Sequence, residues 1–179
     1  MLPSTPYDAK GLLKTAIRDD NPVVFFEDKM MYKMKGPVPP EDYTIPFGVA
    51  DIKRAGTDIT IVATSSMVQV ALGAAKLLEE AGISAEVIDP RTVWPLDEKT
   101  LVESVKKTSR AIVVDEGYER YGVTAEIASV IAQGAFFNLE APVKRMGAMH
   151  VPIPFSPPLE DVTVPTEQSI FEAAKAICG

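Results

Sequence analysis

Two acids stand together where a helix is expected to end, and they suggest a cation site. The run Ala16-Ile17-Arg18-Asp19-Asp20-Asn21 places them at a helix C-terminus, which already carries unpaired carbonyl groups and a partial negative charge. A bound monovalent cation could compensate this charge. Its ligands would be backbone carbonyls and the Asp19 carboxylate, because hard cations take oxygen ligands. Solvated acids beside Arg18 are the alternative interpretation.

Two other polar groups directly follow expected strands, where open α/β sheets usually place their functional loops. One is Asp115-Glu116-Gly117, whose alternative role is turn and cap chemistry. The other is the loop of residues 89–97, which carries Arg91 and Trp94 among prolines. Such a rigid loop suits an interface, so Arg91 either forms a structural ion pair within or between chains or contacts a ligand. Asp97 is expected to cap the next helix.

His150 is the only histidine, so a conventional catalytic triad would have to use it. Its sequence neighbours include neither a nucleophile nor an orienting acid, so a structural or interface role stands beside a place near a catalytic funnel. The sequence has no phosphate-binding glycine loop with its lysine, no G-x-G-x-x-G, no G-x-S-x-G and no H-E-x-x-H motif. Common nucleotide-binding and hydrolase functions are therefore disfavoured.

The composition indicates a globular protein with one sizeable core, since 46% of the 179 residues are hydrophobic. A net charge of −7 disfavours DNA, RNA and anionic membranes as partners. The single cysteine, Cys178, allows neither an internal disulfide nor a cysteine-based metal cluster. With no signal-like or membrane-spanning segment in the sequence, we expect a cytoplasmic protein.

The first 50 residues are expected to form a helix, a strand and a linker. Thr5 and Pro6 are typical of a helix start, and apolar spacing extends the helix from about Pro6 to Ile17. The apolar run Val23–Phe26 is typical of a buried parallel strand. Residues 36–48 are rich in proline and glycine, so we expect an extended linker there, with a domain boundary.

Beyond this linker, strands alternate with helices, which implies a mainly parallel sheet in a three-layer α/β/α domain. The proline-rich stretch 151–165 is expected to be an irregular arm across the surface. The expected strands are 59–63, 85–88, 111–114 and 143–146, and the expected helices are 67–81, closed by Gly82, then 97–107, one through 125–131, and 166–177.

The order of these segments resembles the beta subunit of the decarboxylating component of pyruvate, branched-chain 2-oxo acid and acetoin dehydrogenase complexes. The resemblance covers essentially the whole chain. Residues 148–157, with His150, look more like the acetoin members, because pyruvate members tend to have an acid at that position. The matching stretches are residues 8–24 with Glu27, Pro46-Phe47-Gly48, Asp89-Pro90-Arg91-Thr92 and Asp115-Glu116-Gly117.

The resemblance implies a transketolase C-terminal-like domain over residues 51–179. Residues 36–50 would be the linker, and residues 1–35 a helix-strand remnant of the pyrimidine-binding domain. In the family, thiamin diphosphate and magnesium bind between an alpha subunit and that pyrimidine domain. The family's activating glutamate and active-site histidine have no counterpart here, so we expect the isolated chain to be inactive. The family's potassium site corresponds to Ala16, Ile17, Asp19 and Asn21.

The resemblance also implies partners, namely an alpha subunit, a second beta subunit and a lipoyl-bearing acyltransferase. Arg91, Glu116, His150 and the arm 151–165 are the candidates for these interface or docking contacts. We therefore expect the chain to provide assembly and docking within an acetoin or 2-oxo acid dehydrogenase. The alternatives are a non-catalytic stand-alone assembly module and the C-terminal domain of another transketolase-like enzyme.

Overall fold

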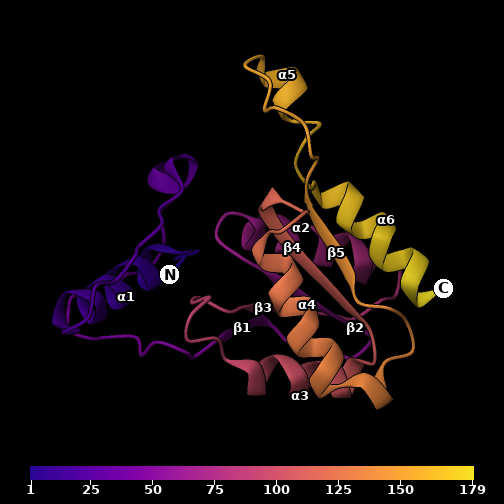
Figure 1. The fold of residues 1–179 in the computed structure, drawn as a ribbon, viewed down its shortest axis with the longest axis horizontal. Helices are drawn as coiled ribbons and strands as arrows, with labels where there is room; N and C mark the ends of the chain where they lie inside the picture. The colour runs from indigo at the N-terminus through magenta and orange to yellow at the C-terminus, as the bar shows by residue number, and fades with distance from the viewer.

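A five-stranded sheet forms the centre of the fold in the computed structural model, which describes residues 1–179 (Figure 1). The spatial order is β1-β3-β2-β4-β5. Four strands are parallel, and β1 pairs antiparallel with β3. The strands are β1 (Asp51–Arg54), β2 (Ile59–Ala63), β3 (Ala85–Asp89), β4 (Ala111–Tyr118) and β5 (Lys144–Ala148).

Helices cover both faces of this sheet. Two of them, α2 and α6, bury one apolar cluster against it, while α3 and α4 bury a second cluster on the opposite face. Along β2, Ile61 belongs to the first cluster and Val62 to the second, so the whole strand is buried. The helices are α1 (Pro6–Arg18), α2 (Met67–Glu80), α3 (Glu98–Thr108), α4 (Val123–Gly134), α5 (Pro157–Glu160) and α6 (Glu167–Cys178), with short 3-10 helices η1 (Lys29–Lys33) and η2 (Phe136–Asn138).

This architecture confirms the expected three-layer domain with a mainly parallel sheet. The long helices lie where the sequence predicts them, and Asp97 caps α3 by accepting a hydrogen bond from the Thr100 amide. Gly82 follows the C-cap residue Ala81 and has a φ of +79°, a conformation that glycine adopts without strain. The arm is irregular as expected, apart from the single turn of α5.

Two details differ from the expectation. The strand β1 was not predicted, and the predicted strand Val23–Phe26 does not form a ladder. Its only backbone partner in the chain is Met1, which makes two hydrogen bonds, one to the Val24 carbonyl and one from the Phe26 amide. A β-strand pairs with a neighbouring strand along its length, whereas this segment pairs with a single residue.

The N-terminal segment lies beside the sheet domain in Figure 1 and is joined to it by extended chain. The helix α1 begins at Pro6, after Thr5 accepts a hydrogen bond from the Asp8 amide. It packs in a small separate core around Leu12 and Ile45. At the other end, the arm carries α5 away from the domain (Figure 1). None of the helices has both the length and the apolar character that a membrane crossing requires.

Candidate functional site

The carboxyl ends of the parallel strands gather the polar residues that the sequence singled out. Arg91 follows β3, Glu116 lies in the last part of β4, and His150 follows β5. Two residues at this edge, Ser65 after β2 and Arg91 after β3, have positive φ values of 50° and 59°. Non-glycine residues keep such conformations only where surrounding contacts hold them, and these conformations often occur at functional sites.

A buried ion cluster ties α1 to this edge. Asp8 of α1 is fully buried, and its Oδ2 lies 2.8 Å from Lys53 Nζ of β1. Arg91 Nε donates to Asp8 Oδ1 at 2.8 Å, while Arg91 Nη2 reaches Asp51 Oδ2 at 2.9 Å. Lys53 also pairs with Asp51 at 2.7 Å. Two cations therefore hold two carboxylates from different segments of the chain.

The charge on Asp8 is stabilised despite its burial. Burial alone would raise the pKa of this carboxyl group, but hydrogen bonds from Lys53 and Thr5 and the nearby charges of Lys53 and Arg91 hold the pKa below its ordinary value. The carboxylate is therefore ionised at neutral pH, and it needs its cationic neighbours to remain so inside the protein.

Asp89, the last residue of β3, completes the cluster and behaves differently. Its Oδ2 accepts a hydrogen bond from the Ser4 hydroxyl at 2.5 Å, and its Oδ1 accepts one from the Arg91 amide at 2.8 Å. Burial raises its pKa to about 6, and the neighbouring Asp8 charge adds to the effect, which the Ser4 hydrogen bond and Lys53 at 3.7 Å only partly offset. Asp89 is the titratable member of the group.

Arg91 therefore forms a structural ion pair within the chain, one of the two roles expected for it. Its side chain is 11% exposed, and both of its terminal contacts are carboxylates of the same chain. The loop backbone adds a further tie, because the Leu2 amide donates to the Arg91 carbonyl. The guanidinium is thus already held by two carboxylates of the same chain.

Glu116 is part of a second, more exposed acidic group. Its Oε2 accepts a hydrogen bond from the Ser66 hydroxyl at 2.7 Å. Partial burial raises its pKa, and the charges of Asp28 and Asp115 act in the same direction. Asp115 accepts hydrogen bonds from the Thr64 hydroxyl and the Gly117 amide, which is the turn chemistry expected as its alternative role.

His150 lies at the end of β5, exposed, and packs its ring edge-on against Tyr118 of β4. The ring centroids are 5.7 Å apart, with an interplanar angle of 71°. Tyr118 also donates a hydrogen bond to the Val151 carbonyl at 3.2 Å. No hydrogen bond joins His150 to a nucleophile or an acid, so the contacts fit a structural or interface residue.

The four proposed cation ligands lie together at the C-terminal end of α1. Ala16 and Ile17 are in its last turn, and Asp19 is the C-cap. Asp19 Oδ1 accepts hydrogen bonds from the Asn21 amide at 2.8 Å and from Asn21 Nδ2 at 2.9 Å. These two bonds, the backbone one first, lower the pKa of the Asp19 carboxyl group. Asp19 and Asn21 also line an apolar groove.

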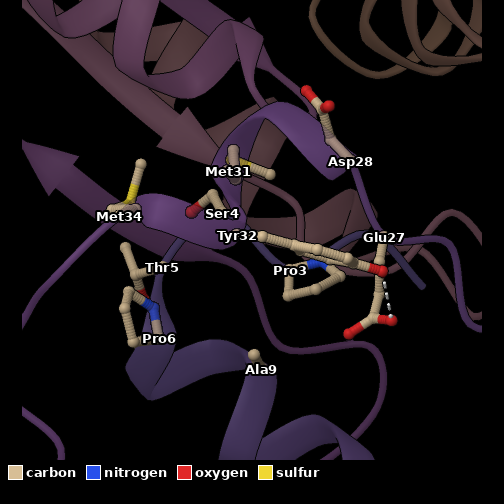
Figure 2. A pocket seen from close by; sticks show the side chains of 10 residues that line it. All are labelled: Pro3, Ser4, Thr5, Pro6, Ala9, Glu27, Asp28, Met31, Tyr32 and Met34. Carbon is tan, nitrogen blue, oxygen red and sulfur yellow. Dashed lines mark hydrogen bonds between the residues drawn. The ribbon is translucent and has the colours of Figure 1, made fainter.

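A small pocket lies between the start of α1 and η1 (Figure 2). Glu27, Asp28, Tyr32 and the hydroxyls of Ser4 and Thr5 line it, and Figure 2 shows the Tyr32 hydroxyl bonded to Glu27. The chain contains no cluster of three or more His, Cys, Asp or Glu side chains arranged to hold a metal ion.

Four members of the ion cluster, namely Asp8, Asp51, Lys53 and Asp89, were not identified as site residues from the sequence. The local sequence indicates only that Asp8 is an acid in the first turn of a helix, which is also its local role in the structure. Lys53 lies in the strand that was not predicted. The only available signal was the placement of Asp89 and Arg91 directly after the predicted strand 85–88.

We predict that Lys53→Met lowers the free energy of unfolding by about 3 kcal/mol or more, because it leaves the buried Asp8 carboxylate short of one cation. The matched control is Lys14→Met, which removes the exposed Lys14–Asp42 ion pair and should cost less than about 1 kcal/mol. Urea denaturation of both variants measures the difference. Equal losses would contradict a dominant role for the buried cluster.

We predict that Asp89→Asn changes the pH dependence of stability. Because the folded pKa of about 6 lies above the ordinary value of 3.8, the folded chain binds more protons than the unfolded chain between these pH values. The Asp89 contribution to stability is therefore lost as pH rises from about 4 to about 6, by roughly 2–3 kcal/mol at most.

Asp89→Asn removes this loss. The change in the free energy of unfolding from pH 4 to pH 7 should therefore be more positive in the variant than in the parent chain. Chemical denaturation at both pH values provides the comparison. An unchanged difference would mean that Asp89 ionises normally.

Comparison with known proteins places the chain in a family. The family model described as "Transketolase, C-terminal domain" matches residues 48–170. Among solved structures, a split gene transketolase described as an inactive beta4 tetramer has a TM-score of 0.63 and 29% sequence identity. That match covers 79% of this chain and 46% of the other.

Relatives of similar sequence are subunits of dehydrogenases. The chain is 50% identical over its full length to the beta subunit of acetoin:2,6-dichlorophenolindophenol oxidoreductase of Bacillus subtilis, of which it covers 52%. It is 48% identical to the pyruvate dehydrogenase E1 component subunit beta of the same organism, and that match covers 99% of this chain and 54% of the subunit. It is 46% identical to the 2-oxoisovalerate dehydrogenase subunit beta of that organism, and that match covers 89% of this chain and 50% of the subunit. The chain thus spans about half the length of these relatives, and it belongs to the transketolase C-terminal domain family.

Proposed function

We propose that this chain supplies the C-terminal half of the beta subunit of a thiamin-diphosphate-dependent acetoin or 2-oxo acid dehydrogenase. The observation that carries the proposal is the 50% identity to an acetoin oxidoreductase beta subunit along the whole chain. Acetoin is the favoured substrate class, on the sequence around His150. The assembled enzyme would cleave its substrate and pass the product fragment to lipoamide, in the cytoplasm.

The role proposed for the chain itself is assembly. Residues 1–35 would complete the pyrimidine-binding domain, residues 36–50 would act as the linker, and residues 51–179 would form the second domain. The buried cluster of Asp8, Lys53, Arg91 and Asp89 supports this role, because it fixes the first of these segments against the third. A rigid connection would hold the two halves of a shared site in register.

Exposed apolar side chains support contacts with other subunits. Met30 and Trp94 are each 86% exposed, and the arm presents Phe155 and Ile153 to solvent. Exposed apolar residues of this size, gathered on projecting segments, are typical of interaction sites. The proposed partners are an alpha subunit, a second beta subunit and a lipoyl-bearing acyltransferase. Glu116, His150 and the arm 151–165 are the proposed contacts.

Thiamin diphosphate and magnesium would bind in the full assembly, and no chemical step is assigned to the residues of this chain. The cofactor supplies the carbanion chemistry when bound, and the proteins around it supply orientation. The resemblance places the activating glutamate in a part of the family's subunit that has no counterpart here, so turnover would require groups outside this chain.

A stand-alone assembly module is the second candidate function. The solved relative described as an inactive beta4 tetramer favours it, since that protein oligomerises in an inactive form. Under this function the isolated chain would oligomerise, and it would contribute nothing to turnover when combined with an alpha subunit.

The first prediction uses a chimera of the Bacillus subtilis acetoin oxidoreductase beta subunit in which these 179 residues replace the matching half. With its alpha subunit, thiamin diphosphate and magnesium, the chimera should reduce dichlorophenolindophenol when acetoin is supplied. The 179-residue chain alone, under the same conditions, should show no turnover. A folded chimera that binds the alpha subunit but turns over neither acetoin, pyruvate nor 2-oxoisovalerate would contradict the proposal.

We also propose a potassium site at Ala16, Ile17, Asp19 and Asn21, supported by the ionised Asp19 carboxylate at the end of α1. Potassium chloride should then stabilise the chain by about 1 kcal/mol over sodium chloride at equal ionic strength, once its concentration exceeds the dissociation constant several-fold. Thermal unfolding measures this difference. Asp19→Ala should abolish it and Asp20→Ala should keep it, whereas loss in both variants would indicate a non-specific charge effect.

A further inference from the structure

Buried polar groups join the N-terminal segment, residues 1–35, to the sheet domain, residues 51–179. No apolar cluster contains residues of both parts, since the small core of the segment is separate from the two clusters on the sheet. The buried polar residues at the contact are Ser4 and Asp8 on the side of the segment and Asp89 on the side of the sheet. The strength of this contact, which we call the joint, therefore depends on polar groups.

Ser4 lies between two carboxylates and has one hydroxyl hydrogen to donate. Its Oγ is 2.5 Å from Asp89 Oδ2 and 3.3 Å from Asp8 Oδ2, and all three residues are fully buried. Ionised carboxylates only accept hydrogen bonds, so when both acids are ionised the Ser4 hydroxyl can donate to only one of them. With a proton on its Oδ2, Asp89 donates to Ser4 and Ser4 donates to Asp8. The geometry thus has a place for one additional proton.

The charges around Asp89 also favour a proton there. When Asp89 is ionised, three carboxylates, one of them partly exposed, face two cations. Both cations are already engaged by the other two carboxylates, and Lys53 Nζ is 3.7 Å from Asp89 Oδ2. A proton on Asp89 restores the charge balance of the buried group. The surrounding groups are Asp8 of α1, Asp51 and Lys53 of β1 and Arg91 of the loop after β3, while α2 contributes the neutral Gln69, which donates to the Ser4 carbonyl.

We infer that the joint is a pH-sensitive contact, in which protonation of Asp89 tightens it through the chain Asp89–Ser4–Asp8 and ionisation of Asp89 weakens it. The groups involved belong to this chain alone. The contact requires no partner and no cofactor, so it is independent of the proposed function.

The sign of the pH effect follows from the two states of the joint. In the closed joint, burial raises the pKa of Asp89 to about 6, whereas separation of the segment admits water and returns the pKa toward its ordinary value of 3.8. The closed joint therefore binds more protons between these values. Its stabilisation by Asp89 is complete below about pH 4, is lost as pH rises, and levels off above about pH 6.

The test follows hydrogen exchange of the 179-residue chain by NMR at about pH 4.5 and about pH 7.5, with each rate corrected for the intrinsic pH dependence of amide exchange. The buried Leu12 of α1 reports separation of the segment, and the buried Ile61 of β2 reports unfolding of the sheet domain. Leu12 should be less protected than Ile61, and its protection should fall at least roughly tenfold between the two pH values. Low urea concentrations should change Leu12 exchange little, because separation exposes less surface than unfolding.

A substitution and a matched control assign the effect to Asp89. Asp89→Asn places a neutral hydrogen-bond donor at this position at every pH, so Leu12 protection should stay near the acidic level and change less than roughly twofold. Asp161→Asn removes an exposed acid from the arm and changes the net charge equally. This control should keep the pH dependence of the parent chain.

Three results would overturn the inference. Leu12 protection could be independent of pH, it could equal that of Ile61 under all conditions, or Asp89→Asn could keep the pH dependence of the parent chain. Should Asp89→Asn fail to fold, a carbon-13 titration of the Asp89 carboxyl group in the parent chain decides. The midpoint of that titration must coincide with the midpoint at which Leu12 protection levels off, and a different midpoint also overturns the inference.

Discussion

The buried carboxylate of Asp8 is the constraint on which the arrangement of the chain depends. A charge removed from water is costly unless cations and hydrogen-bond donors replace the solvent, and here Lys53 and Arg91 do so from the sheet domain. Since Asp8 belongs to α1 and its partners to β1 and the loop after β3, the helix cannot separate from the sheet without exposing or orphaning this charge. The contact also sets where the end of α1 stands relative to the strand ends.

Helices and strands that carry a strong local pattern of apolar residues were predictable from the sequence. The helices α2, α3 and α6 have apolar residues at helical spacing and recognisable caps. The strand β2 is apolar apart from Thr60, and the predicted part of β3, residues 85–88, is apolar apart from Glu86. The strand β1 was not predicted because Asp51, Lys53 and Arg54 leave it only one apolar residue, Ile52. Its place at the sheet edge and its ion pairs stabilise it, and neither is visible in a local pattern.

The candidate site was less predictable, because its contacts join residues far apart in the sequence. Arg91 stood out by its position after a strand, but its partner Asp8 lies 83 residues away. The raised pKa of Asp89 depends on complete burial and on a second acid beside it, which only the folded chain brings about. Glu116 and His150 were found by the rule that strand ends carry functional loops, yet their neighbours Ser66 and Tyr118 come from contacts that this rule does not specify.

The projecting arm also has a consequence for the lifetime of the protein. Phe155 is 101% exposed, and α5, which follows it, is a single turn held by few contacts outside itself. An exposed aromatic residue on an extended segment is readily cut by proteases that cleave after aromatic side chains. Limited proteolysis of the free chain is therefore expected to begin at this arm. In the assembly proposed for the chain, burial of the arm would remove that site, so degradation would select against copies left outside the assembly.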